Sequence, residues 1–259
     1  MTQNEAIKRV LDIARAEIGY HEKASNKNLD SKMANSGSKN YTKYARDLDA
    51  IPNFYNGKKN GYAWCDVFND WLHVKSWGAD VAKKVLYQPD KSSGAGCLYS
   101  ARYYMAKGRF YRTPKPGDQI FFLTSAIIGH TGIVESVSDK EVVTIEGNKG
   151  NCVGRHVYKI DNITIAGYGR PDWKLAAESV KNAESRRTLK KGCKGDDVRQ
   201  MQKDLISLGY ALPKWGADGS FGAETLAAVK RFQLNNGLAV DGIVGPKTYA
   251  AIDRLKGER

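Results

Sequence analysis

The chain has 259 residues, enough for one or two domains that each bury a hydrophobic core. Hydrophobic residues make up 41% of it, charged residues 27% and aromatic residues 10%, which excludes a disordered tail, a collagen and a membrane-spanning bundle. Lys and Arg outnumber Asp and Glu by 41 to 28, and the net charge of +13 favours approach to a polyanion: nucleic acid, anionic lipid or anionic cell-wall polymer. The positive charge is distributed over both parts of the chain: residues 1–185 carry +7 and residues 186–259 carry +6.

Residues 1–20 lack the uninterrupted apolar core of a secretory signal, and no stretch of about 18 apolar residues occurs in the chain. The sequence therefore predicts a protein made in the cytosol, without a membrane anchor. Four cysteines lie far apart, with no C-x-x-C pair among them: Cys65, Cys97, Cys152 and Cys193. Their spacing predicts neither a disulfide framework nor a structural zinc site.

Helical patterns dominate the first part of the chain. Thr2 stands three residues before Glu5, as in a capping box, and apolar residues then recur at helical spacing as far as Ile18. Residues 21–61 are rich in Asn, Ser, Lys and Gly and predict mostly loop. Further helices are predicted at residues 41–48, 63–77 and 97–107. Cys65 falls in the first turn of the second of these, which we expect to be buried.

The pattern changes after residues 113–118, where two prolines and a Gly-Asp pair break the chain. Short runs of β-branched and aromatic residues follow at 119–123, 130–137 and 141–146, with weaker candidates at 153–160 and 163–168. A tight turn at 138–140 joins two of these runs into a hairpin. Helices first and an antiparallel sheet afterwards predict an α+β fold.

The composition changes again after Trp173. Residues 174–188 are polar and carry no packing pattern, so we interpret them as a linker that is partly helical. An internal repeat follows, because Asp218–Thr225 and Asp241–Thr248 share the pattern DG-x-x-G-x-x-T at an offset of 23 residues. Each copy leads into a helix, and an amphipathic helix precedes both, with apolar residues at Val198, Met201, Leu205, Ile206 and Leu208. These patterns predict a small three-helix unit for binding or support, since it has no nucleophile with a nearby histidine.

Cys65 is the candidate nucleophile. A thiol at a helix start has its thiolate stabilised by the helix dipole and by free backbone N–H groups, although a cysteine beside Trp64 also fits a small buried hydrophobe. A cysteine nucleophile needs a base, and we expect His130 to supply it from the rim of its strand. The tight hairpin predicts that Glu146 lies beside His130 as its orienting partner, with Asn148 two residues further on.

The other three histidines are poorer candidates for the base. His73 follows Cys65 by eight residues on the same predicted helix, which separates them by about 12 Å along the axis. His21 lies in a loop context. His156 lies in a weak strand, where we interpret it as facing solvent.

Five short segments carry a family resemblance: Trp64–Phe68, Pro116–Phe122, Gly129–Val134, Ile145–Asn148 and Gly167–Pro171. Together they resemble the CHAP domain, a papain-like cysteine amidohydrolase that acts on peptidoglycan, across residues 1–173. The resemblance implies that Cys65 is the nucleophile, His130 the general base, Glu146 the acidic residue that orients it, and Asn148 an assisting polar residue. It implies that the Cys65 thiolate attacks an amide carbonyl while His130 protonates the leaving amine.

The end of the chain carries a second resemblance. Gly195–Val198, the two repeats and Phe232–Gln233 are similar to the small three-helix peptidoglycan-binding domain attached to many wall hydrolases. We therefore expect a catalytic domain at 1–173, a linker at 174–188 and a binding domain at 189–259. The two resemblances imply peptidoglycan as substrate and anchor, and we expect a monomer. They also imply that anionic wall polymers attract the positive charge.

Some CHAP domains hold calcium near the nucleophile. The corresponding stretch here has Asp47 and Asp49 but lacks the D-x-[DN]-x-[DN]-G loop, so we expect no calcium and no other cofactor. A zinc site of Cys152, His156 and His130 can be drawn, but it lacks a second spaced pair of ligands.

The implied function is that of a phage or prophage endolysin, made in the cytoplasm of the host and acting on the wall after release. We expect an N-acetylmuramoyl-L-alanine amidase. An endopeptidase of the stem or cross-bridge peptide is the alternative, because one triad serves either reaction. Two other classes stay open: a non-catalytic wall-binding protein and a nucleic-acid-binding protein. The latter lacks an aromatic-basic motif, so we expect no nucleic acid partner.

Overall fold

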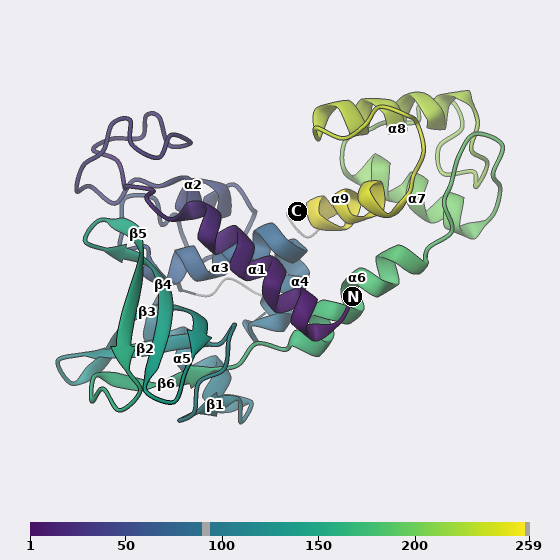
Figure 1. Cartoon of the computed structure of the whole chain (residues 1–259). Helices are drawn as coiled ribbons and strands as arrows, with labels where there is room; N and C mark the ends of the chain where they lie inside the picture. Colours follow the sequence, from purple (N-terminus) through teal and green to yellow (C-terminus); the bar gives the residue numbers. More distant parts are fainter. Residues whose placement is uncertain (90–93, 257–259) are drawn as a thin grey trace. The chain divides into compact units, whose positions relative to one another are not determined.

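The computed structural model describes residues 1–89 and 94–256, which form two compact units that divide after Ala177 (Figure 1). The segment interpreted as a linker, 174–188, lies mostly in helix α6 (Trp173–Ser185), and the division falls within this helix. In the described part of the chain, no helix has the length and apolar character needed to cross a bilayer.

The first unit opens with α1 (Gln3–Glu17), and its predicted capping box is confirmed. The Thr2 hydroxyl accepts from the backbone N–H of Glu5 at 3.2 Å, and the Glu5 carboxylate accepts from the N–H of Thr2 at 2.7 Å. The remaining helices before the sheet are α2 (Lys43–Asp49), α3 (Cys65–Trp77), α4 (Ala79–Val85) and α5 (Cys97–Ala106). The sequence did not predict α4, because Gly78 ends α3 and directly begins a helix of only seven residues.

One six-stranded sheet follows, with every neighbouring pair antiparallel. Its strands are β1 (Phe110–Tyr111), β2 (Gln119–Thr124), β3 (Ile127–Val137), β4 (Glu141–Lys149), β5 (Cys152–Lys159) and β6 (Ile165–Gly169). The order across the sheet is β1-β6-β2-β3-β4-β5. The α+β class is therefore confirmed, and only the two-residue strand β1 was too short to be predicted.

Helices α3 and α5 pack against the sheet, while α1, α2 and α4 pack around α3 (Figure 1). Within α3 only Lys75 is exposed, so this helix lies in the interior of the unit. Burial on all sides fixes the direction of α3 and thereby the place of its first residue, Cys65.

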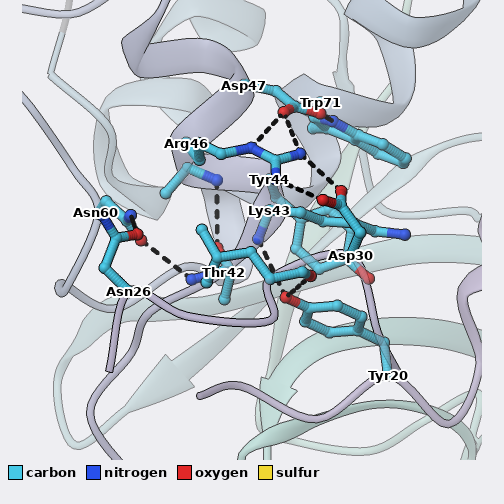
Figure 2. Close-up of polar contacts among 12 residues, drawn as sticks. Tyr20, Asn26, Asp30, Thr42, Lys43, Tyr44, Arg46, Asp47, Asn60 and Trp71 are labelled. Atoms are coloured by element: carbon cyan, nitrogen blue, oxygen red, sulfur yellow. Dashed lines mark hydrogen bonds and ion pairs between the residues drawn. The ribbon is translucent and has the colours of Figure 1, made fainter. Parts of the chain in front are cut away.

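Polar contacts fix α2 between the long loop and α3, as Figure 2 shows. The Arg46 guanidinium lies between Asp30 and Asp47, with Nη2 at 2.7 Å from an oxygen of each. Trp71 of α3 donates its indole N–H to Asp47 at 2.9 Å. These contacts connect residues of the loop, α2 and α3, so the loop between α1 and α2 is held in place next to the core.

The second unit contains α7 (Asp196–Ser207), α8 (Ala223–Asn235) and α9 (Pro246–Lys256), which confirms the predicted helices. Its core includes Val198, Met201 and Leu205 of α7, Phe232 of α8 and Ile252 of α9. Ile206, an apolar residue of the predicted helix, is instead 40% exposed, because it follows Leu205 and so points away from the core-facing side of α7.

Each copy of the repeat is braced by one buried glutamine. Gln202 donates to the side chain of Asp218 at 2.8 Å and to that of Thr225 at 2.9 Å, and it accepts from the N–H of Gly219 at 2.7 Å. Gln233 makes the same three contacts with the second copy. It donates to the Asp241 carboxylate and to the Thr248 hydroxyl, and it accepts from the N–H of Gly242. The repeated sequence thus forms the same turn twice. Each turn is stabilised by a buried glutamine whose side-chain oxygen and nitrogen both have hydrogen-bond partners.

Candidate active site

Cys65 is the first residue of α3 and is 7% exposed. The residue before it, Trp64, is fully buried, and its indole N–H donates to Glu22 at 2.8 Å. Asn69, one turn further along α3, donates to the carbonyl of Cys65 at 3.1 Å. The thiol therefore stands at the positive end of a helix whose start is anchored on both sides.

His130 lies on β3, and its Nε2 is 2.8 Å from Oε2 of Glu146 on β4. Glu146 is fully buried and also accepts from the Thr144 hydroxyl at 2.5 Å and from the Tyr158 hydroxyl at 2.7 Å. Three donors thus hold this carboxylate. The structure brings His130 and Glu146 together as the hairpin predicted, while Thr144 and Tyr158 were missed.

Two glycines make room for these contacts. A Cβ on Gly132 of β3 would lie 2.5 Å from Cγ of Glu146. A Cβ on Gly147 of β4 would lie 2.7 Å from the Trp64 ring and 2.8 Å from Cβ of Phe68. The absence of a side chain at these positions lets β4 approach both β3 and the start of α3.

The charges of Cys65 and His130 depend on each other. Hydrogen bonding from Cys97 and from His130 lowers the pKa of Cys65 well below its ordinary value, against the opposing effect of burial. Burial alone would lower the pKa of His130, but its contacts with the Cys65 thiolate and Glu146 raise it to about 9. The favoured state at neutral pH is therefore a thiolate beside an imidazolium. Because Nε2 of His130 faces Glu146, Nδ1 is the ring nitrogen left for Cys65.

Glu146 stays ionised in this arrangement. Burial would raise its pKa, but hydrogen bonds from His130, Thr144 and Tyr158 outweigh burial and lower it. A negative carboxylate fixes the orientation of the ring and stabilises its protonated form. The three side chains can therefore form a relay in which the thiolate attacks and the imidazolium donates a proton.

Two further residues contact Cys65 and were not selected from the sequence. Sγ of Cys97, the first residue of α5, lies 3.4 Å from Sγ of Cys65. Asp66 is 3% exposed, and burial together with the neighbouring Cys65 thiolate raises its pKa to about 6. Position at a helix start was a sequence signal for Cys97, but the distance between the two helix starts depends on tertiary packing.

The other residues singled out from the sequence lie apart from this relay. Asn148 has a left-handed backbone with φ of 65°, and in the described part of the chain its side chain makes no hydrogen bond. His73 is buried on α3, and burial lowers its pKa to about 3. His21 pairs with Cys152 in an isolated β-bridge. His156 does not simply face solvent: it is half-buried on β5, and its Nε2 is enclosed without a partner.

The acidic residues considered for calcium are engaged by the protein itself. Asp47 is paired with Arg46 and Trp71, as in Figure 2, and Asp49 accepts from the backbone N–H groups of Lys59 and Asn60 at 2.7 and 2.9 Å. A guanidinium against Asp47 is a poor neighbour for a divalent cation. Over residues 1–89 and 94–256, no cluster of three His, Cys, Asp or Glu side chains has a geometry that suits a metal ion.

An open groove of about 610 Å³ lies beside the site. It is lined mainly by apolar residues of α5, β1, β2 and β6 and by the β3 residue Ile128, which precedes His130 by two positions. Phe110, Ile128 and Ala166 line this groove and also pack against the buried cluster that contains Cys65 and Cys97. The groove and the buried cluster around the thiol therefore share these three residues.

A cysteine at a helix start that faces a histidine and a carboxylate on an antiparallel sheet is the arrangement of the papain-like class. Comparison with family models gives the narrower identity. Residues 57–148 match the CHAP domain, and residues 194–252 match the model described as "Putative peptidoglycan binding domain". The chain thus carries a CHAP domain followed by a C-terminal peptidoglycan-binding domain.

Curated relatives match short parts of the chain. N-acetylmuramoyl-L-alanine amidase CwlL of Bacillus licheniformis is 49% identical over 71 residues, which are 27% of this chain and 20% of that protein. Zinc D-Ala-D-Ala carboxypeptidase of Streptomyces albus G is 42% identical over 71 residues, 27% of this chain and 28% of that protein. The chain therefore spans less than a third of the length of either relative.

A solved structure, the SleB N-terminal domain, is 35% identical and covers 29% of this chain and 97% of its own, with a TM-score of 0.26. The two curated relatives carry names of different chemistry, an amidase and a zinc carboxypeptidase.

Proposed function

We propose that this chain is a peptidoglycan hydrolase that cleaves an amide bond with Cys65 as nucleophile, His130 as general acid and base, and Glu146 as the orienting carboxylate. The observation that carries the proposal is the unbroken series of contacts from Cys65 through His130 to Glu146, inside a region that matches the CHAP domain. The match of residues 194–252 to a peptidoglycan-binding domain supports the wall as substrate.

The reaction has two halves. The Cys65 thiolate attacks the amide carbonyl, the C–N bond breaks, and the imidazolium of His130 gives its proton to the leaving amine. Water then attacks the thioester while His130 takes a proton from it, and the Cys65 thiolate leaves. The N–H groups at the start of α3 stabilise the oxyanion that forms in each half. Asn148 is retained in the proposal only as a polar neighbour of the site.

The bond that we propose is the one between N-acetylmuramic acid and L-alanine, as in the amidase relative of Bacillus licheniformis. We further propose an endolysin-type setting, with synthesis in the cytoplasm and action on the wall after release. Attraction to anionic wall polymers is supported by the net charge of +13, which both units share. Lysis that is undiminished at high salt would contradict this electrostatic role.

Replacement of the nucleophile tests the mechanism. In the full chain, Cys65→Ala should lower the rate of lysis of purified walls by at least about 10³-fold, while sedimentation with the same walls is unchanged. Cys152→Ala is the matched control, because Cys152 is a free cysteine on β5 outside the relay. A Cys65→Ala chain that lyses walls like the control would favour the non-catalytic wall-binding protein.

Analysis of the products tests the bond. Mass spectrometry of digested walls should find free stem peptides that begin with L-alanine. Muropeptides cut within the stem or the cross-bridge would instead identify an endopeptidase, with the same three residues in the same roles.

A further inference from the structure

Cys97 forms and breaks no bond in the reaction proposed above, although its hydrogen bond lowers the pKa of Cys65. Their Sγ atoms are 3.4 Å apart, and both thiols are free. A disulfide has an S–S bond of about 2.05 Å, so the two sulfurs need to approach by only about 1.4 Å. Each cysteine is the first residue of its helix, α3 or α5.

A buried carboxylate holds the two helix starts together. Asp66, the residue after Cys65, accepts from the N–H of Gly96, the residue before Cys97, at 2.8 Å. The same carboxylate oxygen accepts from the Ser100 hydroxyl of α5 at 2.9 Å. Residues adjacent to both cysteines are thus joined directly, so the approach of the two sulfurs is a fixed property of the packing between α3 and α5.

The two sulfurs differ in charge. The pKa of Cys65 is lowered, first by the hydrogen bond from Cys97, whereas the pKa of Cys97 is raised by the same contact and by burial. Cys65 therefore carries the thiolate, which is the form that peroxides oxidise, and Cys97 keeps its proton. Cys65 is 7% exposed, and a hydroperoxide is a smaller molecule than the wall amide of the proposed reaction.

We propose that Cys97 is the resolving thiol of a reversible redox lock on Cys65. This inference rests on the proposed function, because only a nucleophilic Cys65 makes the lock a switch of activity. It assigns to Cys97 a covalent role beyond its hydrogen bond to Cys65.

The chemistry of the lock has two steps and takes a hydroperoxide as oxidant. The Cys65 thiolate attacks the peroxide, an S–O bond forms, the O–O bond breaks, and Cys65 becomes a sulfenic acid while the peroxide is reduced to hydroxide or alkoxide. Cys97 then attacks the Cys65 sulfur, the S–S bond forms, and the hydroxyl leaves as water with the proton of Cys97. An external dithiol reduces the disulfide and restores the thiolate.

Without a resolving thiol, the sulfenic acid of Cys65 meets further peroxide and becomes a sulfinic acid, which dithiols do not reduce. The lock therefore stops lysis reversibly and protects the nucleophile from permanent loss. This difference between reversible and irreversible inactivation is what an experiment can measure.

The experiment uses the full chain as wild type, Cys97→Ala, Cys97→Ser and, as matched control, Cys152→Ser. Each protein is treated with hydrogen peroxide and then with dithiothreitol, and wall lysis is measured after each step. Wild type and Cys152→Ser should lose lysis and regain most of it, whereas both Cys97 variants should regain at least about tenfold less. Peptide mapping of oxidised wild type should find Cys65 and Cys97 in one disulfide-linked pair of peptides.

Oxidised wild type without that linked pair would overturn the proposal, and so would Cys97 variants that recover as fully as wild type. The peptide map needs no variant, so it decides the question even if a substitution at the buried Cys97 disturbs folding. It also separates the two proposals: lysis by Cys65→Ala would refute the proposed function, while the presence or absence of the disulfide is read from mass alone.

Discussion

The two units of the chain bury polar side chains for different ends. In the first, Cys65, His130 and Glu146 come from three elements and shift one another's pKa values. In the second, Gln202 and Gln233 are buried as well, yet each is an amide that cannot titrate and that has partners for both its oxygen and its nitrogen. Both sets satisfy buried polar groups with hydrogen bonds.

The difference shows what separates a reactive cluster from a structural brace. Each glutamine of the second unit holds a backbone N–H, a hydroxyl and an exposed Asp carboxylate without changing charge itself, so its effect is on the free energy of unfolding. The relay of the first unit ends in a thiolate, and its members change charge. Substitutions should therefore separate activity from stability according to the unit in which they fall.

The largest effect in this comparison is expected from Glu146→Gln. The change leaves the size of the side chain nearly unaltered but removes the negative charge beside His130, so wall lysis should fall by about 10²- to 10⁴-fold. Wall sedimentation by the second unit should be unchanged. Loss of both lysis and sedimentation would show that the substitution unfolds the chain. Activity and stability would then not be separated by the unit in which a substitution falls.

The same variant should change the dependence of activity on pH. His130 must be protonated to serve the leaving amine, so wild-type lysis should fall as the pH rises through about 9, the pKa of His130. Glu146 helps to raise that pKa, so its removal should move this alkaline limb to lower pH. If the alkaline limb of the pH profile lies at the same pH in Glu146→Gln as in wild type, the carboxylate does not raise the pKa of His130.

A smaller effect is expected from Tyr158→Phe. The Tyr158 hydroxyl donates to Glu146 at 2.7 Å, and loss of a hydrogen bond to a charged group costs about 1.5 to 3 kcal/mol. Because Tyr158 acts on the base only through Glu146, it is a positioning residue. Its loss should lower the rate of lysis by about tenfold and lower the pH of the alkaline limb slightly. A tenfold loss with an unmoved limb would indicate a general structural role instead.

The smallest effect on activity is expected from Gln202→Ala. It should destabilise the second unit by about 1 to 3 kcal/mol, since the N–H of Gly219 and the Asp218 side chain lose their buried partner. Lysis of solubilised wall fragments should not change. Gln200→Ala is the control, because Gln200 is exposed on the same helix and its loss should cost about 0.5 kcal/mol or less. Equal melting temperatures for both variants would contradict the brace.

Much of this arrangement was predictable because it depends on local patterns. The capping box at Thr2, the place of Cys65 in the first turn of α3 and the hairpin that pairs His130 with Glu146 all follow from spacing within a short stretch of chain. The hydrogen bond from Thr144 to Glu146 could also have been predicted. Thr144 precedes Glu146 by two residues on β4, so the two side chains lie on the same face of the sheet.

The rest depends on contacts between distant segments. Cys97 reaches Cys65 only because Asp66 holds the start of α5, and nothing in the spacing of residues 65 and 97 fixes that distance. Similarly, α4 was not predictable from the sequence, because a single residue, Gly78, separates it from α3 and because it has only seven residues. The left-handed backbone of Asn148 is likewise not revealed by its two-residue offset from Glu146.

The anchor of Trp64 has a consequence for protein engineering. Glu22 accepts from the Trp64 indole with one oxygen and from the N–H of Asn40 with the other, at 2.8 and 3.0 Å. The long segment between α1 and α2, which looks dispensable in composition, therefore aligns the residue that precedes the thiol. Anyone who shortens the chain to a minimal lytic fragment should cut elsewhere, because a deletion that removes Glu22 would leave α3 intact and its first residue misplaced.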